Sequence, residues 1–509
     1  MKNVKRAAAL ALCGLLVLGS LFGCSASATD GLQIIRIGHN QSTNHPTHTG
    51  LLAFEEYVEG ELGDKYDIQI FPSELLGSQN EMVQLTQTGA ITFCVASNSL
   101  LETFSDNYTL FNLPYLFASP EAYHASMDDP AIVDPIFEST MQAGFEAVTW
   151  LDAGTRNFYT INTPIETPAD LRGLKIRVQQ SPTNVRMMEL LGGSATPMGF
   201  GDVYTALQSQ MLDGAENNEL ALTDNGHGDV CKYYSYTMHQ MIPDILIGNL
   251  DFMESLSEEE RAIFDEGFQI LNQTQRDAWE TAVEEAKNTA ENEQGVTFLY
   301  PDIIPFQEAV APMHQEMLET IPTWRPSTSS SRPTTPSTRR IPSERRACFS
   351  MQATRKVLNR IMNVLAGVSL IAMTALTCWQ VFTRYVLNNP STWSEELVGY
   401  LFAWASLFGA SLITGERGHM NIPVVVEKMP AAAQKFFAIF AELIAMAFSL
   451  IILVYGGYRI TLLAMGQMTS SLGVAVGVFY VAMPVCGVIN ILYTILNIYD
   501  ICKGKKKEA

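Results

Sequence analysis

The stretch that decides the fold runs from Gly154 to Asn217 and reads GTRNFYTINTPIETPADLRGLKIRVQQSPTNVRMMELLGGSATPMGFGDVYTALQSQMLDGAEN. Within it, "LKIRVQ" (residues 174–179) alternates apolar and polar side chains, which predicts a β-strand. Leu174, Ile176 and Val178 share one face of that strand, and Lys175, Arg177 and Gln179 share the other. By periodicity alone, Arg177 is a strand residue that faces solvent.

The end of the same stretch predicts a helix and then a turn. The helix runs from about Gly201 to Gln210, and the turn lies at Gly214. Glu216 and Asn217 would follow on the side of a cleft. Without further information, Asn217 is most simply a cap or turn residue.

The residues before this stretch alternate between strand and helix patterns. Strands are predicted at Gln33–Ile37 and Tyr66–Pro72, and helices at Leu51–Leu62 and Asn80–Gln87. Such alternation favours open α/β sheets. Residues 25–325 are also enough for two lobes, by the usual length of a domain.

A long helix is predicted after residue 257. Ser257 and Glu260 form a capping-box pattern, and apolar residues then recur at helical spacing as far as Leu271. Much of the formal net charge of −21 belongs to this half of the chain. That acidity argues against nucleic acid as a partner.

The second half of the chain has the composition of membrane helices. Four apolar stretches lie at residues 357–382, 397–414, 436–460 and 474–498, each close to the ~20 residues that span the hydrocarbon. Lys and Arg residues precede the first stretch, separate the second from the third, and follow the fourth. Both ends and the middle loop should therefore be cytoplasmic, against the single counter-signal of Arg384 on the outer side.

The first residues have the pattern of an export signal. Lys2, Lys5 and Arg6 precede an apolar run that ends in "LFGC", which places Cys24 at a lipoprotein-type cleavage site. Residues 1–24 are thus expected to be a signal peptide, with Cys24 acylated. Cleavage of a plain secretory signal after Ala26 or Ala28 is the alternative.

Catalytic and metal-binding motifs are missing from the sequence. It has no GxxxxGK[ST] loop, GxSxG elbow, CxxC pair or HExxH motif. His39, His45 and His48 lack ligand spacing on a helix. Cys94 and Cys231 are expected to be isolated buried thiols, and a disulfide between them is the alternative. We therefore expect no cofactor, no metal and no enzyme; an enzyme would have to use carboxylates such as Asp202 or Glu216.

Three ordered motifs resemble a known family. "TPxDLRGLKIRV", "TPMGFGDVYTALQ" and "DGAEN" are similar to the solute receptors of tripartite ATP-independent periplasmic (TRAP) transporters. The resemblance implies a two-lobe α/β fold of the periplasmic-binding-protein type (type II), with a long connecting helix, that closes on an organic acid. It also implies that Arg177 pairs with the substrate carboxylate and that Asn217 helps to hold it. A planar guanidinium can grip a carboxylate with two parallel bonds, which lysine cannot do.

The resemblance adds further candidate ligand residues, each with a structural alternative. Arg156 resembles a second arginine on the ligand side, or else forms a salt bridge between the lobes. Asn40 follows the first strand, where α/β sheets bind ligands, but asparagine is common in loops. Glu81 could accept bonds from sugar hydroxyls or simply favour the start of a helix. Phe200 could stack on the ligand or pack in the core.

The substrate class also follows from resemblance. Asn217-Asn218 and "CKYYSYTMHQMIPDILI" are similar to receptors that favour hexuronates and related sugar acids. Uptake of a C4-dicarboxylate by the same kind of secondary transporter is the alternative. A receptor that feeds a signalling system is a second alternative of another class.

The membrane half resembles the small subunit of the same transporters. "RYVLNNPSTWSEELVGYLFAWASLFGA" and "GHMNI" carry that likeness and imply an all-α domain of four transmembrane helices over residues 351–509. The implied partners are a separate large membrane subunit and the lipid bilayer. Glu395 and Glu396 lie at the start of a membrane helix, where carboxylates are costly, so they are candidates for contact with a partner. The alternative is that this helix start is simply exposed at the membrane interface.

The junction between the halves raises a topological conflict. Residues 326–350 are rich in Ser, Thr, Pro and Arg, so they are expected to be a disordered linker. The receptor must end outside the cell membrane, yet the first span should begin inside, and a polar tract cannot cross hydrocarbon. Cleavage of the chain, inversion of the first span, or a frameshift that joins two neighbouring genes would each resolve the conflict.

Overall fold

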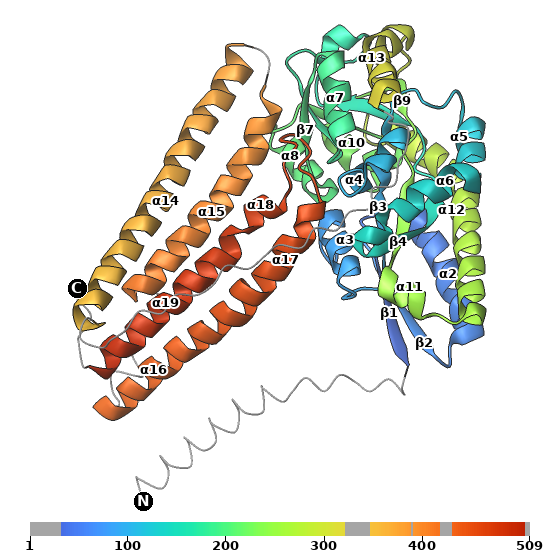
Figure 1. The fold of residues 1–509 in the computed structure, drawn as a ribbon. Helices are drawn as coiled ribbons and strands as arrows, with labels where there is room; N and C mark the ends of the chain where they lie inside the picture. The colour runs from blue at the N-terminus through green and yellow to red at the C-terminus, as the bar shows by residue number, and fades with distance from the viewer. Residues whose placement is uncertain (1–31, 321–346, 388–389, 418–429, 504–509) are drawn as a thin grey trace, which may run out of the picture.

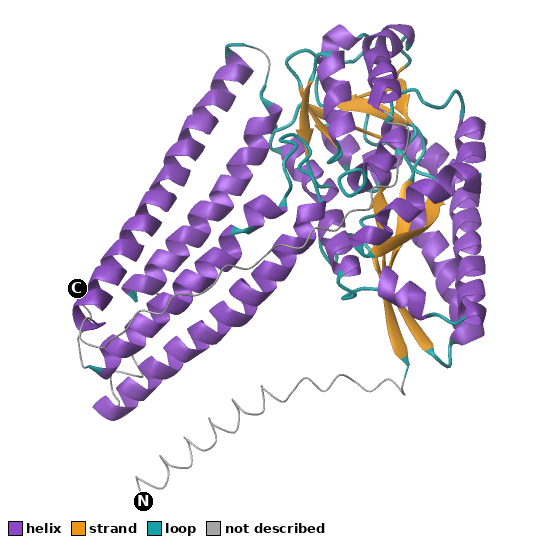
Figure 2. Cartoon of the chain, viewed as in Figure 1, coloured by secondary structure: helices purple, strands orange, loops and turns teal. Residues whose placement is uncertain are grey.

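The computed structural model describes residues 32–320, 347–387, 390–417 and 430–503 of the 509-residue chain. The expected signal peptide and Cys24 lie outside these residues. So does the expected linker as far as residue 346, whereas helix α14 already begins at Ala347. The N-terminal half (residues 32–320) contains two β-sheets, and the C-terminal half (residues 347–503) is helical (Figures 1 and 2).

The first sheet and its helices form lobe 1. Its strands lie in the order β2 (Tyr66–Phe71), β1 (Gln33–Gly38), β3 (Phe93–Ser97), β10 (Asp244–Asn249) and β4 (Phe145–Leu151). The first three strands are parallel, and β10 runs antiparallel to both of its neighbours. Helices α2 (Pro46–Leu62) and α3 (Gln79–Gln87) follow β1 and β2. The predicted alternation of strand and helix is confirmed, although α2 begins five residues earlier, where His45 caps it.

The second sheet forms lobe 2. Its strands lie in the order β11 (Thr297–Leu299), β9 (Tyr233–Gln240), β5 (Arg156–Thr160), β8 (Gly214–Asn217), β6 (Lys175–Val178) and β7 (Ser194–Pro197). The predicted turn at Gly214 is wrong, because Gly214 begins strand β8 between β5 and β6. The predicted helix is present as η4 (Phe200–Asp202) and α8 (Val203–Gln208).

One long helix joins the lobes. Helix α12 (Glu258–Asn292) begins with the predicted capping box of Ser257 and Glu260. It packs on α2 of lobe 1 and on α9 (Leu220–Thr223) of lobe 2. Phe268 stacks on Phe54 in the core of lobe 1, and the Phe264 ring packs against Phe54 at a tilt, which anchors the first half of α12 there.

Ten further helices, of which α13 is the longest, complete the described part of the N-terminal half. They are α4 (Asn98–Leu101), η1 (Asp106–Asn112), α5 (Pro120–Met127), α6 (Pro130–Phe137), η2 (Glu138–Ala143), η3 (Pro168–Leu171), α7 (Pro182–Leu191), α10 (His227–Val230), α11 (Leu250–Ser255) and α13 (Ile304–Thr320).

The C-terminal half contains four helical segments that are long and apolar enough to cross a membrane. The first two are α14 (Ala347–Tyr385) and α15 (Thr392–Glu416). The third combines α16 (Ala431–Phe448), the π-helical segment η6 (Ser449–Gly456) and α17 (Gly457–Leu463), and ends in η7 (Ala464–Gly466). The fourth combines α18 (Gly477–Tyr480) and α19 (Ala482–Cys502). All four predicted spans are thus found.

The basic residues mark one end of this bundle. Arg355 donates to Asn497 (2.7 Å), and Lys435 donates to the carbonyl of Cys502 (3.1 Å), so the starts of the first and third spans lie beside the end of the fourth. The N-terminal half contacts the opposite end, at the turn between α14 and α15 (Figure 1). Because cytoplasmic ends carry the excess of Lys and Arg, the N-terminal half lies on the extracytoplasmic side.

Candidate functional site

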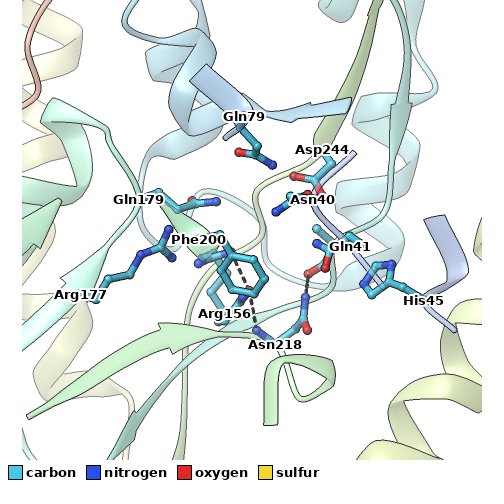
Figure 3. Close-up of a pocket in the computed structure, with 12 residues that line it drawn as sticks. Asn40, Gln41, His45, Gln79, Arg156, Arg177, Gln179, Phe200, Asn218 and Asp244 are labelled. Atoms are coloured by element: carbon cyan, nitrogen blue, oxygen red, sulfur yellow. Dashed lines mark hydrogen bonds between the residues drawn. The ribbon is translucent and has the colours of Figure 1, made fainter. Parts of the chain in front are cut away.

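A cavity lies between the two lobes, and polar side chains from both sheets surround it (Figure 3). It is lined by Asn40, Gln41, His45, Gln79, Ala153, Arg156, Arg177, Gln179, Phe200, Asn217, Asn218 and Asp244. The lobes meet beside it, since Gln179 of lobe 2 donates to the hydroxyl of Ser97 in lobe 1 (2.7 Å). The structure therefore holds the lobes closed.

Arg177 brings an almost fully buried guanidinium to this cavity. Its Nε and Nη2 both donate to the carbonyl of Met198, at 3.1 and 2.8 Å, and its Cζ lies 5.6 Å from the centre of the Phe200 ring. Burial lowers the pKa of Arg177 to about 10. The side chain stays charged at neutral pH but is poorly solvated, which favours an anionic ligand. The solvent-facing position expected from periodicity is wrong, because Arg177 is buried and its guanidinium packs against Met198 and Phe200.

Arg156 also lines the cavity, but a carboxylate of its own lobe already pairs with it. Its Nε donates to Oε2 of Glu216 (2.5 Å), and its Nη2 donates to the Glu216 carbonyl (2.8 Å). Burial opposes ionisation of Glu216, yet Arg156 and His239 outweigh it and lower the pKa of Glu216 to about 2. The alternative of a salt bridge between the lobes is wrong, because strands β5 and β8, which carry the pair, are neighbours in lobe 2.

Asn217 and Asn218 are positioned by this ion pair and by the backbone. The side-chain oxygen of Asn217 accepts from Nη1 of Arg156 (2.9 Å) and from the backbone N–H of Asn218 (3.0 Å). This orientation directs the Asn217 amide nitrogen, a donor, away from Arg156. Asn218 in turn donates to the carbonyl of Ala153 (2.9 Å), at the crossing from β4 to β5.

Lobe 1 contributes amides and a neutral imidazole. The side-chain oxygen of Asn40 is buried at the cavity and has no hydrogen-bond partner among the described residues. His45 Nδ1 accepts from the backbone N–H of Thr47 (3.2 Å), and burial lowers the pKa of His45 to about 3. Its proton therefore lies on Nε2, which makes that atom a donor.

Glu81 does not line the cavity, contrary to its assignment as a ligand residue. Its carboxylate accepts from the backbone N–H and the hydroxyl of Ser78 at the start of α3, at 2.8 and 2.9 Å. This capping box occupies the side chain, and Gln79, two residues earlier, lines the cavity instead.

Asp244 is the acidic residue of the cavity lining. It begins β10 in lobe 1 and lies across the cavity from Arg177 (Figure 3). Burial raises the pKa of Asp244 to about 6, against the opposing field of Arg156. Arg177 and Asp244 therefore give the cavity one cationic and one acidic side.

A hydrogen bond joins lobe 2 to lobe 1 beside Phe200. The Glu74 carboxylate of lobe 1 accepts from the backbone N–H of Gly201, and burial raises the pKa of Glu74. Ser73 and Glu74 both have positive φ angles, 54° and 58°, which costs energy in residues with a Cβ atom. Phe200 is only partly buried and packs edge-on against His227, so its ring serves both the cavity wall and the core.

No group of three or more His, Cys, Asp or Glu side chains that could hold a metal ion occurs in the described part of the chain. Cys94 and Cys231 are both buried, and neither forms a disulfide within the described residues.

Seven lining residues lie outside the set of ligand residues predicted from the sequence: Gln41, His45, Gln79, Ala153, Gln179, Asn218 and Asp244. Gln179 could have been found, since it shares the strand face of Lys175 and Arg177. Gln41, His45, Gln79 and Asp244 come from lobe 1, in a loop or at the start of a helix or strand, where side chains carry no periodic signal. Only the closure of the two lobes brings them opposite Arg177.

Two families match the chain. The profile of the bacterial extracellular solute-binding proteins, family 7, matches residues 37–320. The profile of the DctQ component of tripartite ATP-independent periplasmic transporters matches residues 373–504.

Solved and curated relatives agree with the first match. A TRAP periplasmic solute-binding protein of Anaerococcus prevotii, crystallised with α/β-D-glucuronate, is 70% identical over 56% of this chain and 93% of its own, with a TM-score of 0.56. One from Xanthobacter autotrophicus with β-D-galacturonate is 32% identical over 55% of this chain and 94% of its own, with a TM-score of 0.54. The protein YiiZ of Salmonella typhimurium is 40% identical over 284 residues, which cover 56% of this chain and 86% of its own.

These matches cover both halves of the chain and agree with its two-lobed fold and its four apolar helical segments. The chain therefore belongs to the bacterial extracellular solute-binding proteins of family 7, the receptors of TRAP transporters, and carries a DctQ-type membrane component in the same sequence.

Proposed function

We propose that the N-terminal half binds a hexuronate, such as D-glucuronate or D-galacturonate, and delivers it to a TRAP transporter. The observation that carries this proposal is the buried guanidinium of Arg177, which faces a closed cavity lined mainly by amide side chains. The ligand carboxylate would pair with Arg177 and accept a further bond from the Asn217 amide. Each charge-assisted bond contributes about 1.5–3 kcal/mol, and micromolar binding needs about 8 kcal/mol in total.

The charges of the cavity favour a hydroxylated monoacid over a dicarboxylate. Glu216 already neutralises Arg156, so Arg177 is the lining cation without a carboxylate partner in this structure. A second ligand carboxylate would approach Asp244, which repels it at neutral pH. Sugar hydroxyls, in contrast, can donate to Asp244 and both donate to and accept from the amides of Asn40 and Gln79.

The relatives support the same substrate class. Both solved relatives described above contain a hexuronate, and one of them is 70% identical to this chain over the receptor. A ligand with fewer hydroxyl groups, such as succinate or malate, would leave buried amide side chains without hydrogen-bond partners. This is the physical basis for discrimination against it. Uptake of a C4-dicarboxylate, the alternative, would require a second free cation in the cavity.

The same proposal covers the rest of the chain. The receptor takes up its ligand outside the cell membrane and passes it to a complex of the DctQ-type half with a separate large membrane subunit, without transforming it. Acylation of Cys24 would hold the receptor at the membrane, and residues 1–24 would be its signal peptide. Residues 25–325 would form the solute-binding domain, and residues 351–509 the small membrane subunit.

We also infer that the two halves act as separate polypeptides. The N-terminal half contacts the extracytoplasmic end of the bundle, whereas α14 begins at the end that carries Arg355 and Lys435. Residues 326–346 would therefore have to cross the bilayer, which their polar composition forbids. Resequencing of the junction, with immunoblots of membranes, tests this inference; an intact reading frame and one full-length band would contradict it.

A thermal-shift screen tests the substrate class. D-glucuronate or D-galacturonate should raise the melting temperature of the receptor, because a ligand that binds only the folded state stabilises it. Succinate and malate should give no shift at the same concentration. A shift with either dicarboxylate and none with the hexuronates would end the hexuronate proposal. Recovery of unchanged ligand after incubation would separate a receptor from an enzyme.

A further inference from the structure

The C-terminal half contacts both lobes of the receptor, through two separate loops. The first loop includes the helix ends that flank it: it comprises the end of α14, the connection and the first turn of α15 (residues 384–396, of which 388 and 389 are not described), and its described residues contact lobe 2. The second loop (residues 464–477) joins α17 to α18 and contacts lobe 1. Each lobe thus has its own contact with the membrane half.

The contact on lobe 2 is mainly electrostatic. Glu395 forms an ion pair with Lys175 of β6. The Glu395 side chain is only 28% exposed, and that of Lys175 only 10%. Nη2 of Arg384 lies 3.6 Å from the Asp213 carboxylate, which also accepts the backbone N–H of Lys175 (2.8 Å). The Ser194 hydroxyl donates to the Pro390 carbonyl (3.0 Å). Partial burial makes such charge pairs stronger than pairs on an open surface.

The contact on lobe 1 consists of hydrogen bonds. Nε2 of Gln467 donates to the side-chain oxygen of Asn80 in α3 (2.7 Å). The backbone N–H of Met468 donates to the carbonyl of Thr103 (2.9 Å). Asn80 directly follows Gln79, which lines the ligand cavity, so this contact also lies at the cavity rim.

One strand face connects the membrane, the ligand cavity and the other lobe. Lys175, Arg177 and Gln179 alternate along β6 and the residue after it. Lys175 pairs with Glu395 of the membrane half, Arg177 lines the cavity, and Gln179 donates to Ser97 of lobe 1. A shift of lobe 2 relative to lobe 1 would therefore move the Lys175 contact as well.

Glu396 fixes the spacing between the two loops. Its Oε2 accepts from the backbone N–H groups of Ser471 and Leu472 in the second loop, at 2.9 and 3.2 Å. The adjacent Glu395 binds lobe 2, so two neighbouring carboxylates tie the second loop and lobe 2 to the start of α15. Because the two loops are held at a fixed distance from each other, they can contact both lobes only at one distance between the lobes. In this structure that distance is the one of the closed receptor.

We propose that the two loops of the DctQ-type half recognise the closed receptor, with one loop on each lobe. An opened receptor could satisfy one loop at a time, since hinge motion changes the distance between Asn80 and Lys175. By linkage, docking and ligand binding then strengthen each other. The dependence on ligand rests on the proposed hexuronate function, whereas the residue contacts do not.

Cysteine cross-linking in the full sequence, produced in membranes, tests the proposal. The double variant Asn80→Cys, Gln467→Cys places one thiol on lobe 1 and one on the second loop. Mass spectrometry of the disulfide-linked peptides detects the cross-link whether the two halves form one polypeptide or two. D-glucuronate should accelerate the cross-link by about tenfold. Glu395→Lys, which disrupts only the contact on lobe 2, should slow it by about tenfold, and Lys175→Glu in the same chain should restore it.

Matched controls separate the possible failures. Lys65→Glu breaks an ion pair with Glu260 within the N-terminal half and should leave the cross-link unchanged. Binding of D-glucuronate is measured on every variant, which shows that each is folded. If the wild type does not bind D-glucuronate, the hexuronate function fails, and the charge swap still tests the docking contact without ligand. If the ligand binds but neither ligand nor charge reversal alters the cross-link, the docking proposal is wrong.

Discussion

Replacement of Arg177 by methionine tests the role of its guanidinium while keeping most of the buried volume. The variant removes the cation that would pair with the ligand carboxylate. The lost charge-assisted bonds and the unpaired carboxylate should together weaken hexuronate binding by about 4 kcal/mol, roughly a thousandfold. Arg177→Lys keeps the charge but not the planar fork, so its loss should be intermediate.

The unliganded protein should respond very differently to the same change. Burial lowers the pKa of Arg177 from 12.5 to about 10, so the empty receptor bears a cost of about 3 kcal/mol for holding this charge. The two bonds to the Met198 carbonyl offset much of that cost. Arg177→Met removes both the buried charge and these two bonds, so the free energy of unfolding should change by only about 1–2 kcal/mol, or a few degrees in melting temperature.

Two assays on the same samples distinguish these effects. Isothermal titration calorimetry gives the affinity for D-glucuronate, and thermal melts without ligand give the stability. We expect Arg177→Met to lose the affinity and keep the melting temperature within a few degrees. Binding within about threefold of wild type would refute the pairing of Arg177 with the carboxylate.

Three further predictions concern acidic residues around the cavity. Burial raises the pKa of Asp244 to about 6, and its ionised form accepts stronger bonds from sugar hydroxyls than its protonated form, so the affinity should fall about tenfold from pH 7.5 to 5. Asp244→Asn should flatten this pH dependence, and an equal slope in both proteins would contradict the prediction. The pKa of Glu216 is about 2 in the folded protein, below its ordinary 4.5, so its ionised form contributes stability that is complete above pH 4.5 and lost toward pH 2. In thermal melts of the receptor half, Glu216→Gln should remove about 3 kcal/mol of this loss of stability in acid. An unchanged dependence of stability on pH would count against the prediction. Glu74→Gln should weaken the hydrogen bond that Glu74 accepts from the backbone N–H of Gly201 in the other lobe. The ligand dissociation rate should then rise about tenfold in stopped-flow measurements, and an unaltered rate would show that this bond does not keep the lobes closed.

Local patterns predicted much of the fold. Hydropathy alone located all four membrane spans, since length and apolar composition are local properties. The capping box of Ser257 and Glu260 located the start of α12. Gly214 was placed wrongly in a turn because its role is a tertiary one: strands β5 and β6 approach its backbone too closely for a side chain.

The site was less predictable because two lobes build it. Arg177 lies on the predicted strand, but its burial depends on tertiary contacts such as those with Met198 and Phe200, which the periodicity of the strand does not report. Asn40 and Phe200 do reach the cavity, whereas Glu81 is held in a capping box. The pattern of Ser78 followed by Glu81 was readable in the sequence and already favoured the helix-start role.

The contact between the halves could not be derived from the sequence. Glu395 and Glu396 were candidates for partner contact only because carboxylates are costly at a membrane helix. The structure gives them separate roles, one toward Lys175 and one toward the second loop. Adjacent residues on a helix point in different directions, but what lies in each direction depends on the tertiary arrangement.

The most direct test of the whole account compares two ligands that differ only at the carboxylate group. Calorimetric titration of the wild-type chain with D-glucuronate should give micromolar affinity, because its carboxylate pairs with Arg177. D-glucuronamide keeps every hydroxyl but carries no charge, and it should bind at least about a hundredfold more weakly. Equal affinity for both ligands would contradict the central claim that a buried guanidinium selects an anionic sugar.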